Sequence, residues 1–94
     1  MTYELDFNVE AEKEWRKLDA TIRSQFAKKL RERLENPHVP SARLHNLKDC
    51  YKIKLRAVGY RLVYRVKDDT VTVTVIAVGK RDGSEVYDDA TIRQ

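Results

Sequence analysis

The spacing of apolar residues changes near the middle of the chain, and this change constrains the fold more than any other feature. From Ala11 to Leu34, apolar residues recur every three or four positions, which places them on one face of a helix. After Arg43 they recur at every second position, which places them on one face of a strand. The loop between these residues contains two prolines, which disfavour helix and sheet interiors. The sequence therefore predicts helices first and a sheet afterwards.

A short strand and two helices are predicted for the first part of the chain. The opening residues alternate between apolar and polar, with Tyr3, Leu5 and Phe7 on the inward face of a strand. Asn8 and Asp19 are suitable N-caps for the two helices that follow. The helical stripes are Ala11, Trp15 and Leu18 in the first helix, and Ile22, Phe26, Leu30 and Leu34 in the second. We expect the two helices to be antiparallel and joined by a tight turn.

The second part of the chain predicts three strands, at about 50–57, 60–67 and 70–79. Their short connections favour an antiparallel meander. The last strand is rich in β-branched residues, so we expect it to be central and covered by the helices. The predicted fold class is therefore α+β, in the order βααβββ. An antiparallel sheet packs against two N-terminal helices, and a short C-terminal tail or helix completes a single domain over residues 1–94.

Several classes of protein fit the sequence poorly. The longest apolar stretch, Val71–Val78, is interrupted by threonines and is too short to span a bilayer. The N-terminus lacks the charged and apolar regions of a signal peptide. A lone cysteine, Cys50, cannot form an internal disulfide and fits a reducing compartment. We therefore expect a cytoplasmic protein that does not act on a membrane.

Other groups that could carry chemistry have simpler interpretations. His38 and His45 lie in or beside the proline-containing loop without a metal-ligand spacing, so the sequence predicts no metal site and no cofactor. Cys50 is expected to be a buried thiol at the start of a strand rather than a nucleophile. The acids at the start of the first helix, Glu10, Glu12 and Glu14, are expected to be solvated charges.

Three cations alternate with three apolar residues in the first strand of the predicted meander. They are Lys52, Lys54 and Arg56, and the apolar residues are Tyr51, Ile53 and Leu55. One face of this strand is therefore apolar and the other is cationic. From Arg43 to Lys67 there are eight Lys or Arg residues against one acid, Asp49, so the charge is local. Because such a row repels itself, we expect an anionic partner, first of all a phosphate backbone. A solvated face that guards against aggregation stays open as the alternative.

The register of the first hairpin can be predicted from the same alternation. A connection at Ala57-Val58 places Lys54 opposite Arg61 and Ile53 opposite Leu62, whereas a slip by one residue would mix charges with the core. Five cations are then predicted to share one face: Lys52, Lys54, Arg56, Arg61 and Arg65. Like charges directly opposite each other destabilise a sheet, so we expect this cluster to serve a function.

A cluster of this kind has the parts for recognising RNA. Neighbouring cations lower the pKa of a lysine, which can then act as a general base. An arginine can hold a phosphate through two N–H groups and stabilise the charge that develops during phosphoryl transfer. A tyrosine ring can stack on a base, and Tyr87 follows shortly after Lys80-Arg81. Spacing alone favours RNA binding and leaves open whether the RNA is also cut.

Blocks of sequence from most of the chain, taken together, are specific enough to suggest a family. They are Glu14–Leu18, Asp49–Arg56, Gly59–Tyr64, Val78–Arg81 and Ser84–Tyr87. In this combination the chain resembles the RelE branch of the RelE/ParE toxin superfamily over nearly its whole length. The resemblance implies a fold like that of small microbial ribonucleases. It also implies a metal-independent, ribosome-dependent endoribonuclease that cuts mRNA in the ribosomal A site through attack by the adjacent ribose 2′-hydroxyl, and so inhibits translation.

The resemblance also implies an active site made of cations and a tyrosine: Lys52, Lys54, Arg61, Arg81 and Tyr87. Lys54 would be the general base, with its pKa lowered by Lys52 and Arg61. Arg61 would stabilise the charge on the scissile phosphate, and Arg81 would lie near the leaving 5′-oxygen. Tyr87 would stack on a base and bend the codon for in-line attack.

The partners implied by the resemblance are the ribosome, mRNA and an antitoxin of the RelB type. The antitoxin would neutralise the toxin, and the two together would bind operator DNA as corepressors. Further cations could hold 16S ribosomal RNA, namely Arg43, Lys48, Arg56 and Arg65. The cations of the second helix either share that role or form a solvated face. Two alternatives remain: a non-enzymatic inhibitor of DNA gyrase, as in the ParE branch, and a plain RNA-binding module.

Overall fold

The computed structural model describes residues 2–80 and 85–93. The elements in chain order are β1 (Glu4–Phe7), α1 (Val9–Arg16), α2 (Ala20–Glu35), the 3₁₀-helix η1 (Pro40–Ala42), β2 (Cys50–Leu55), β3 (Tyr60–Lys67), β4 (Thr72–Lys80) and α3 (Glu85–Arg93). The predicted α+β class and order of elements are confirmed, and the C-terminal segment is a helix. None of the helices in the described ranges is long and apolar enough to cross a membrane.

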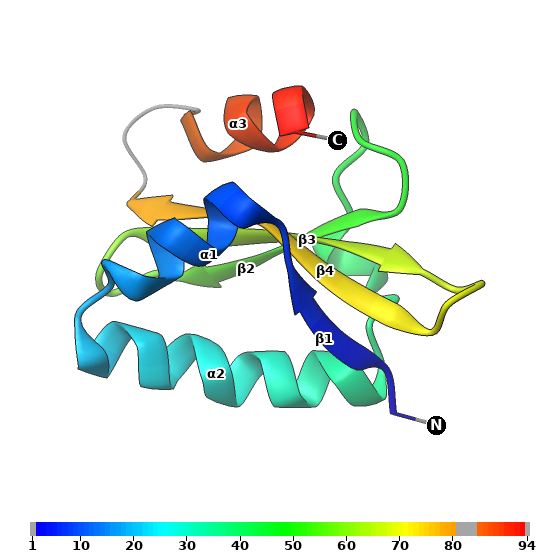
Figure 1. Cartoon of the computed structure of the whole chain (residues 1–94), viewed down its shortest axis with the longest axis horizontal. Helices are drawn as coiled ribbons and strands as arrows, with labels where there is room; N and C mark the ends of the chain where they lie inside the picture. The colour runs from blue at the N-terminus through cyan, green and yellow to red at the C-terminus, as the bar shows by residue number, and fades with distance from the viewer. Residues whose placement is uncertain (1, 81–84, 94) are drawn as a thin grey trace.

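The four strands form one sheet in the order β1-β4-β3-β2 (Figure 1). The last three strands are the predicted antiparallel meander, but β1 runs parallel to β4, with Leu5 beside Val73 and Phe7 beside Val75. The prediction of an antiparallel sheet is therefore wrong for this pair of strands. Short turns impose antiparallel pairing only on strands that they join, and two helices separate β1 from the rest of the sheet.

Strand β1 is less buried than its alternating sequence predicts. Tyr3 and Phe7 pack against the main core, and the Phe7 ring lies 5.3 Å from the Trp15 ring between centroids. Leu5, however, is 41% exposed, so the prediction that it faces inward is wrong. Because β1 is an edge strand, a side chain in its middle keeps contact with solvent.

The predicted helix caps are confirmed. The Asn8 side chain accepts a hydrogen bond from the backbone N–H of Ala11 at 2.8 Å, and Asp19 accepts one from Thr21 at 3.3 Å. Each cap satisfies a backbone donor that the first turn of a helix leaves unpaired. Residues Ile22, Phe26 and Leu30 are buried along α2, as their spacing predicts.

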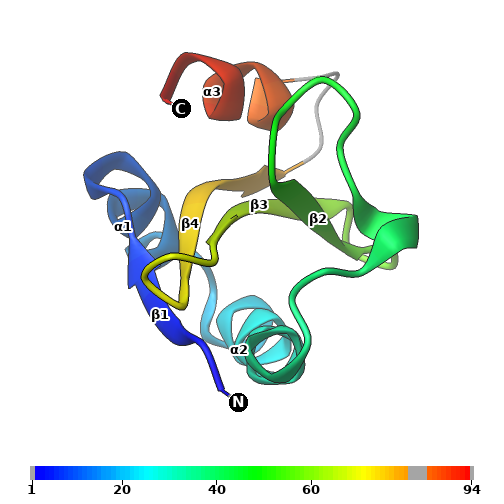
Figure 2. The same cartoon turned by 90° about the vertical axis from the view of Figure 1, so that its right-hand side faces the viewer.

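Helices α2 and α3 lie on opposite faces of the sheet (Figure 2), and each face has its own hydrophobic core. On one face, residues of α2 such as Phe26 and Leu30 pack against Ile53 and Leu62. On the other face, α3 packs against the sheet. Its core consists of Leu47, Cys50, Val63, Ile76, Ala77, Val86 and Ala90. Strand β4 is buried over most of its length because helices cover both of its faces, so its predicted central position is confirmed.

Candidate active site

The hairpin of β2 and β3 has the predicted register. Lys54 pairs with Arg61, and Ile53 pairs with Leu62. Strand β2 ends at Leu55, two residues earlier than predicted, and the turn occupies residues 56–59. Gly59 has a φ of 71°, which is in the left-handed region that glycine adopts without steric cost. The register therefore holds the side chains of Lys52, Lys54 and Arg61 on one face of the sheet near the hairpin end.

The cations at the hairpin end line shallow surface hollows. One hollow of about 280 Å³ is lined by Lys54, Arg56, Gly59 and Arg61. A second, of about 310 Å³, adjoins it on the outer side of β2 and is lined by Arg33, Ser41, Ala42, Lys52, Lys54 and Arg56. Lys54 and Arg56 line both hollows. This part of the surface offers positive charge in an open concavity, which is suited to a phosphate group.

The positive charge changes the acidity of one lysine in particular. The pKa of Lys54 is lowered chiefly by Lys52 and then by Arg61, with smaller effects from burial and from Arg56. The predicted direction of this shift is confirmed. A lowered pKa increases the share of neutral amine at neutral pH, and only the neutral amine can accept a proton.

Two arginines on this face have buried donors without partners. The Nε atoms of Arg61 and Arg65 are buried, and neither has a hydrogen-bond partner among the described residues. A buried N–H group without a partner is costly, so the fold holds both guanidinium groups in place at some cost in stability. Arg61 lies directly opposite Lys54, which makes it the better placed of the two for a ligand bound there.

The five predicted cations do not form a single cluster. Arg65 pairs with Cys50, four residues along β2 from Lys54, which corresponds to about 13 Å. Arg65 lines a separate hollow at that end, together with Asn8, Lys67, Thr74, Ile76 and Arg93. Arg56 lies in the turn rather than on the strand, and its side chain is exposed. The strand pattern specifies a shared face, but it does not specify distance along that face.

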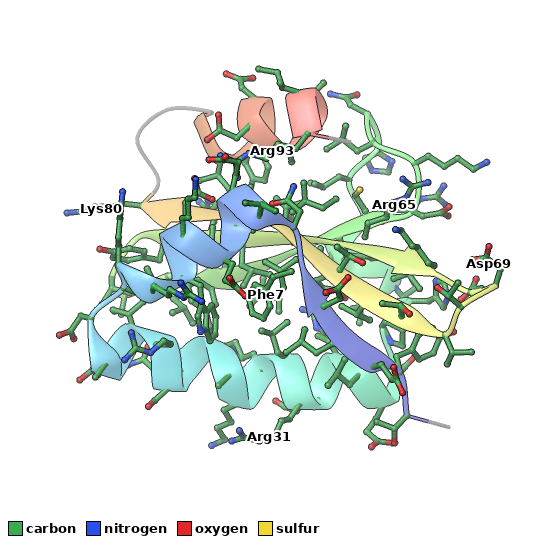
Figure 3. The ribbon with its side chains drawn as sticks, in the orientation of Figure 1. Phe7, Arg31, Arg65, Asp69, Lys80 and Arg93 are labelled. Carbon is green, nitrogen blue, oxygen red and sulfur yellow. The ribbon has the colours of Figure 1, made fainter. Side chains whose placement is uncertain are left out.

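Two of the predicted site residues lie in the C-terminal part of the chain. Tyr87 is on α3 and is half-buried. It lines a hollow of about 430 Å³ together with Leu44, His45, Asn46, Leu47, Asp88 and Thr91. Arg81 lies outside the described residues. Strand β4 ends at Lys80, which pairs with Tyr60 next to Arg61, so β4 ends beside the cationic hairpin (Figure 3).

The residues assigned to ribosomal RNA differ in their surroundings. Arg43 and Lys48 are exposed, and Arg43 forms an isolated backbone bridge with Tyr51. In α2, the residues Lys28, Lys29 and Arg31 are also exposed. Arg33 differs from them because its Nη1 donates hydrogen bonds to the Lys52 carbonyl at 3.2 Å and to the Tyr64 hydroxyl at 2.9 Å. Arg33 therefore supports the strand that carries the lysines.

Cys50 and His38 have structural surroundings. Burial raises the pKa of the Cys50 thiol to about 11, which opposes the thiolate that a nucleophile needs, and the interpretation as a buried thiol is confirmed. His38 Nε2 lies 2.8 Å from Asp68 Oδ1, and the Tyr3 hydroxyl donates to the same oxygen at 2.6 Å. Within residues 2–80 and 85–93, no three His, Cys, Asp or Glu side chains are grouped so that they could hold a metal ion.

Glu14 is not the solvated charge that its position in the sequence suggests. Its carboxylate accepts hydrogen bonds from both Nη atoms of Arg93, at 2.8 and 3.0 Å, and from the backbone N–H of Val78 at 3.2 Å. The side chain of Glu14 is 29% exposed and that of Arg93 is 16% exposed. The expectation was wrong because the partners come from β4 and α3, more than sixty residues away, and no local pattern signals them.

Comparison with known proteins identifies relatives over the whole length of the chain. Residues 5–84 match the family described as the ParE toxin of the type II toxin–antitoxin system parDE. The mRNA interferase toxin RelE of Escherichia coli K12 is 57% identical over 93 residues, which cover 99% of this chain and 98% of that protein.

Solved structures extend the similarity to the fold. A free mutant form of the Escherichia coli toxin RelE superimposes with a TM-score of 0.92 at 56% identity, covering 99% of this chain and 98% of that one. The toxin in the intact Escherichia coli RelBE toxin–antitoxin complex superimposes with a TM-score of 0.83 at 56% identity. That match covers 86% of this chain and 99% of that one.

Proposed function

Because the chain belongs to the RelE/ParE family of toxins of type II toxin–antitoxin systems, we propose that it is a ribosome-dependent mRNA endonuclease that inhibits translation. Its relative in Escherichia coli is named as an mRNA interferase. The observation that supports the proposal most is the pairing of Lys54 with Arg61 beside Lys52, which lowers the pKa of Lys54. This arrangement provides a base and a phosphate-binding cation at one place.

In the proposed reaction, mRNA is cut in the ribosomal A site by its own ribose. Neutral Lys54 accepts the proton of the 2′-hydroxyl, and the 2′-oxygen attacks the adjacent phosphorus. The bond between phosphorus and the 5′-oxygen breaks, and the 5′-oxygen takes a proton from solvent, which leaves a 2′,3′-cyclic phosphate and a 5′-hydroxyl. Arg61 stabilises the negative charge on the non-bridging oxygens as it develops. Lys52 contributes by keeping the pKa of Lys54 low.

Arg81 and Tyr87 complete the proposed site. Arg81 would neutralise the charge on the leaving 5′-oxygen, and Tyr87 would stack on a base so that the scissile bond is aligned for attack. In this scheme cations supply the electrostatic stabilisation, so the reaction as proposed is metal-independent. Stacking on α3 requires this helix to hold the Tyr87 ring in a fixed place, and α3 is packed on the sheet.

The proposed partners follow from the family and from the exposed charge. We propose that the protein binds 16S ribosomal RNA through Arg43, Lys48, Arg56 and Arg65, of which the first three are exposed. We also propose neutralisation by an antitoxin of the RelB type, since the Escherichia coli relative has been solved in complex with its antitoxin. Repression of the operon would then occur through operator DNA bound by the toxin–antitoxin complex.

The test is the pattern of mRNA ends in a translating extract. Addition of the protein should produce cuts in phase with codons, mapped by primer extension, and the variants Lys54→Ala and Arg81→Ala should abolish them. The matched control is Lys13→Ala, because Lys13 is an exposed lysine on α1, away from the β2–β3 hairpin. Strong cleavage of free RNA would contradict ribosome dependence. Intact message together with double-strand DNA breaks in cells would point instead to inhibition of DNA gyrase.

A further inference from the structure

Among the described residues, no strand pairs with the outer edge of β4 beyond the end of β1. The parallel ladder between β1 and β4 ends where Phe7 pairs with Val75, and the N–H of Asn8 bonds to the carbonyl of Val75. On the same edge, the carbonyl of Ile76 accepts a hydrogen bond from Arg93 Nη1 at 3.0 Å. The N–H of Val78 donates to Glu14 Oε1 at 3.2 Å. Two charged side chains thus replace a neighbouring strand.

These two side chains also bind each other in a bidentate pair. Glu14 from α1 and Arg93 from the last turn of α3 meet through two hydrogen bonds of 2.8 and 3.0 Å, and Figure 3 shows Arg93 between α3 and α1. Bidentate pairs between arginine and a carboxylate are among the stronger hydrogen-bonded contacts. The pair is more protected from solvent than the pair of Arg16 and Glu12 on α1, whose side chains are 73% and 52% exposed.

The other attachments of helix α3 lie in its first six residues, where Val86 and Ala90 belong to the second core and Tyr87 packs against it. It contains nine residues, which is too short for stable helix formation on its own in water. Its fully packed side chains are small, namely Val86 near its start and Ala90 in its middle. Arg93 therefore provides the contact that fixes its C-terminal end. Tyr87 lies six residues before Arg93, or about 9 Å along the helix axis.

We propose that Glu14 and Arg93 form a clamp that holds α3 on the sheet and thereby positions Tyr87. The two residues are positioning residues, since they act through α3 and do not touch the RNA. The clamp joins the first helix, the last strand and the last helix of the described chain at one point. The positioning of Tyr87 for cleavage rests on the proposed function, whereas the clamp itself does not.

The clamp is tested by amide hydrogen exchange of the full chain, which needs no activity. In Glu14→Ala and in Arg93→Ala, amides of α3 should exchange roughly 10- to 100-fold faster, the range expected for loss of a charge-assisted hydrogen-bonded pair. Amides of β3 that exchange only through global unfolding lose the same pair, and they should accelerate by no more than this factor. Arg93→Lys, which keeps the charge but cannot form two parallel bonds, should be intermediate. The control is Arg16→Ala, which removes an exposed pair on the same α1 and should leave α3 unchanged.

The link to Tyr87 is tested by single-turnover cutting of mRNA on programmed ribosomes. Arg93→Ala should lower the cutting rate at saturation, whereas the protein concentration that gives half of the maximal rate should stay the same. The reason is that the variant still binds the ribosome but aligns the bound RNA less well. Arg93→Ala combined with Tyr87→Ala should be no slower than Tyr87→Ala alone, because both changes remove the same contribution.

Each part of the proposal has an outcome that overturns it. Unchanged exchange of α3 in Arg93→Ala overturns the clamp, and so does equal acceleration of α3 in the control Arg16→Ala, which would indicate general destabilisation. Additive losses of rate in the double variant overturn the positioning of Tyr87. If the wild-type protein leaves ribosome-bound mRNA intact, the proposed function fails, and the exchange measurements still decide whether the clamp exists.

Discussion

Tyr64 provides the most direct test of how the structure supports its lysines. Its ring is fully buried between the sheet and α2, and its hydroxyl donates to the carbonyl of Pro37 at 2.8 Å. The same hydroxyl accepts a hydrogen bond from Arg33, which also bonds the carbonyl of Lys52. The substitution Tyr64→Phe removes one oxygen atom and leaves the ring in place. It therefore isolates the hydrogen bonds from the packing.

The expected loss of stability follows from the two hydrogen bonds that the hydroxyl makes. In Tyr64→Phe, the carbonyl of Pro37 keeps only the N–H of Val39, and Arg33 keeps only its bond to Lys52. Each buried hydrogen bond contributes about 0.5–1.5 kcal/mol net, so the loss of two should cost about 1–3 kcal/mol. For a domain of this size, 1 kcal/mol corresponds to about 4–8 °C in Tm, so the variant should melt roughly 5–20 °C below the wild type.

Thermal and urea unfolding followed by circular dichroism measure this loss. The matched control is Tyr3→Phe, which removes a hydroxyl bonded to the exposed carboxylate of Asp68, where water can replace the bond. The control should lie within about 1 kcal/mol of the wild type. Equal stability of Tyr64→Phe and the wild type would refute the reasoning, because the buried hydroxyl would then contribute nothing net.

Four further predictions concern charge and burial. Lys54→Met should abolish cutting while the Tm at neutral pH stays equal or rises, because the repulsion from Lys52 and Arg61 is removed. In a pH–rate profile of cutting, Lys52→Met should move the acidic limb, where the rate rises as Lys54 loses its proton, to higher pH, because Lys52 is the largest cause of the lowered pKa of Lys54. Hydrogen bonds from Tyr3 and His38 lower the pKa of Asp68 in the folded protein. Asp68 therefore stabilises the fold above its unfolded pKa, and this stabilisation is lost as the pH falls through its folded pKa. Urea unfolding measured at several pH values should show this loss in the wild type and not in Asp68→Asn. Cys50 should react with a thiol reagent only after unfolding, since it is buried and its pKa is raised; rapid labelling of the native protein would contradict this.

Local patterns predicted the elements of this fold well. The side-chain oxygens of Asn8 and Asp19 identified the helix starts, and the alternation around Lys54 fixed the hairpin register. These features depend on neighbours within a few residues or on one short turn. The direction of β1 was mistaken because its partner strand lies more than sixty residues later, and the sequence between them imposes no direction.

The candidate site was predictable to the same degree. The pattern placed Lys52, Lys54 and Arg61 together, since pairing in a hairpin follows from its register. It did not reveal the support of Lys52 by Arg33, nor the pairing of Glu14 with Arg93. Both contacts join elements that meet only in the packed structure. Residue type gave no help either, because a solvated and a partly buried arginine look the same in a sequence.

The central place of β4 in the sheet has a consequence for how the protein folds during its synthesis. This strand pairs with β1 on one side and β3 on the other, and both cores rest on it. It is also the last strand to be synthesised, with only α3 to follow among the described elements. During translation the four-stranded sheet therefore cannot form until β4 has been synthesised, because β1 pairs only with β4 among the described strands. The chain thus completes its sheet late in synthesis, after both strands of the hairpin that carries Lys54 and Arg61 have emerged.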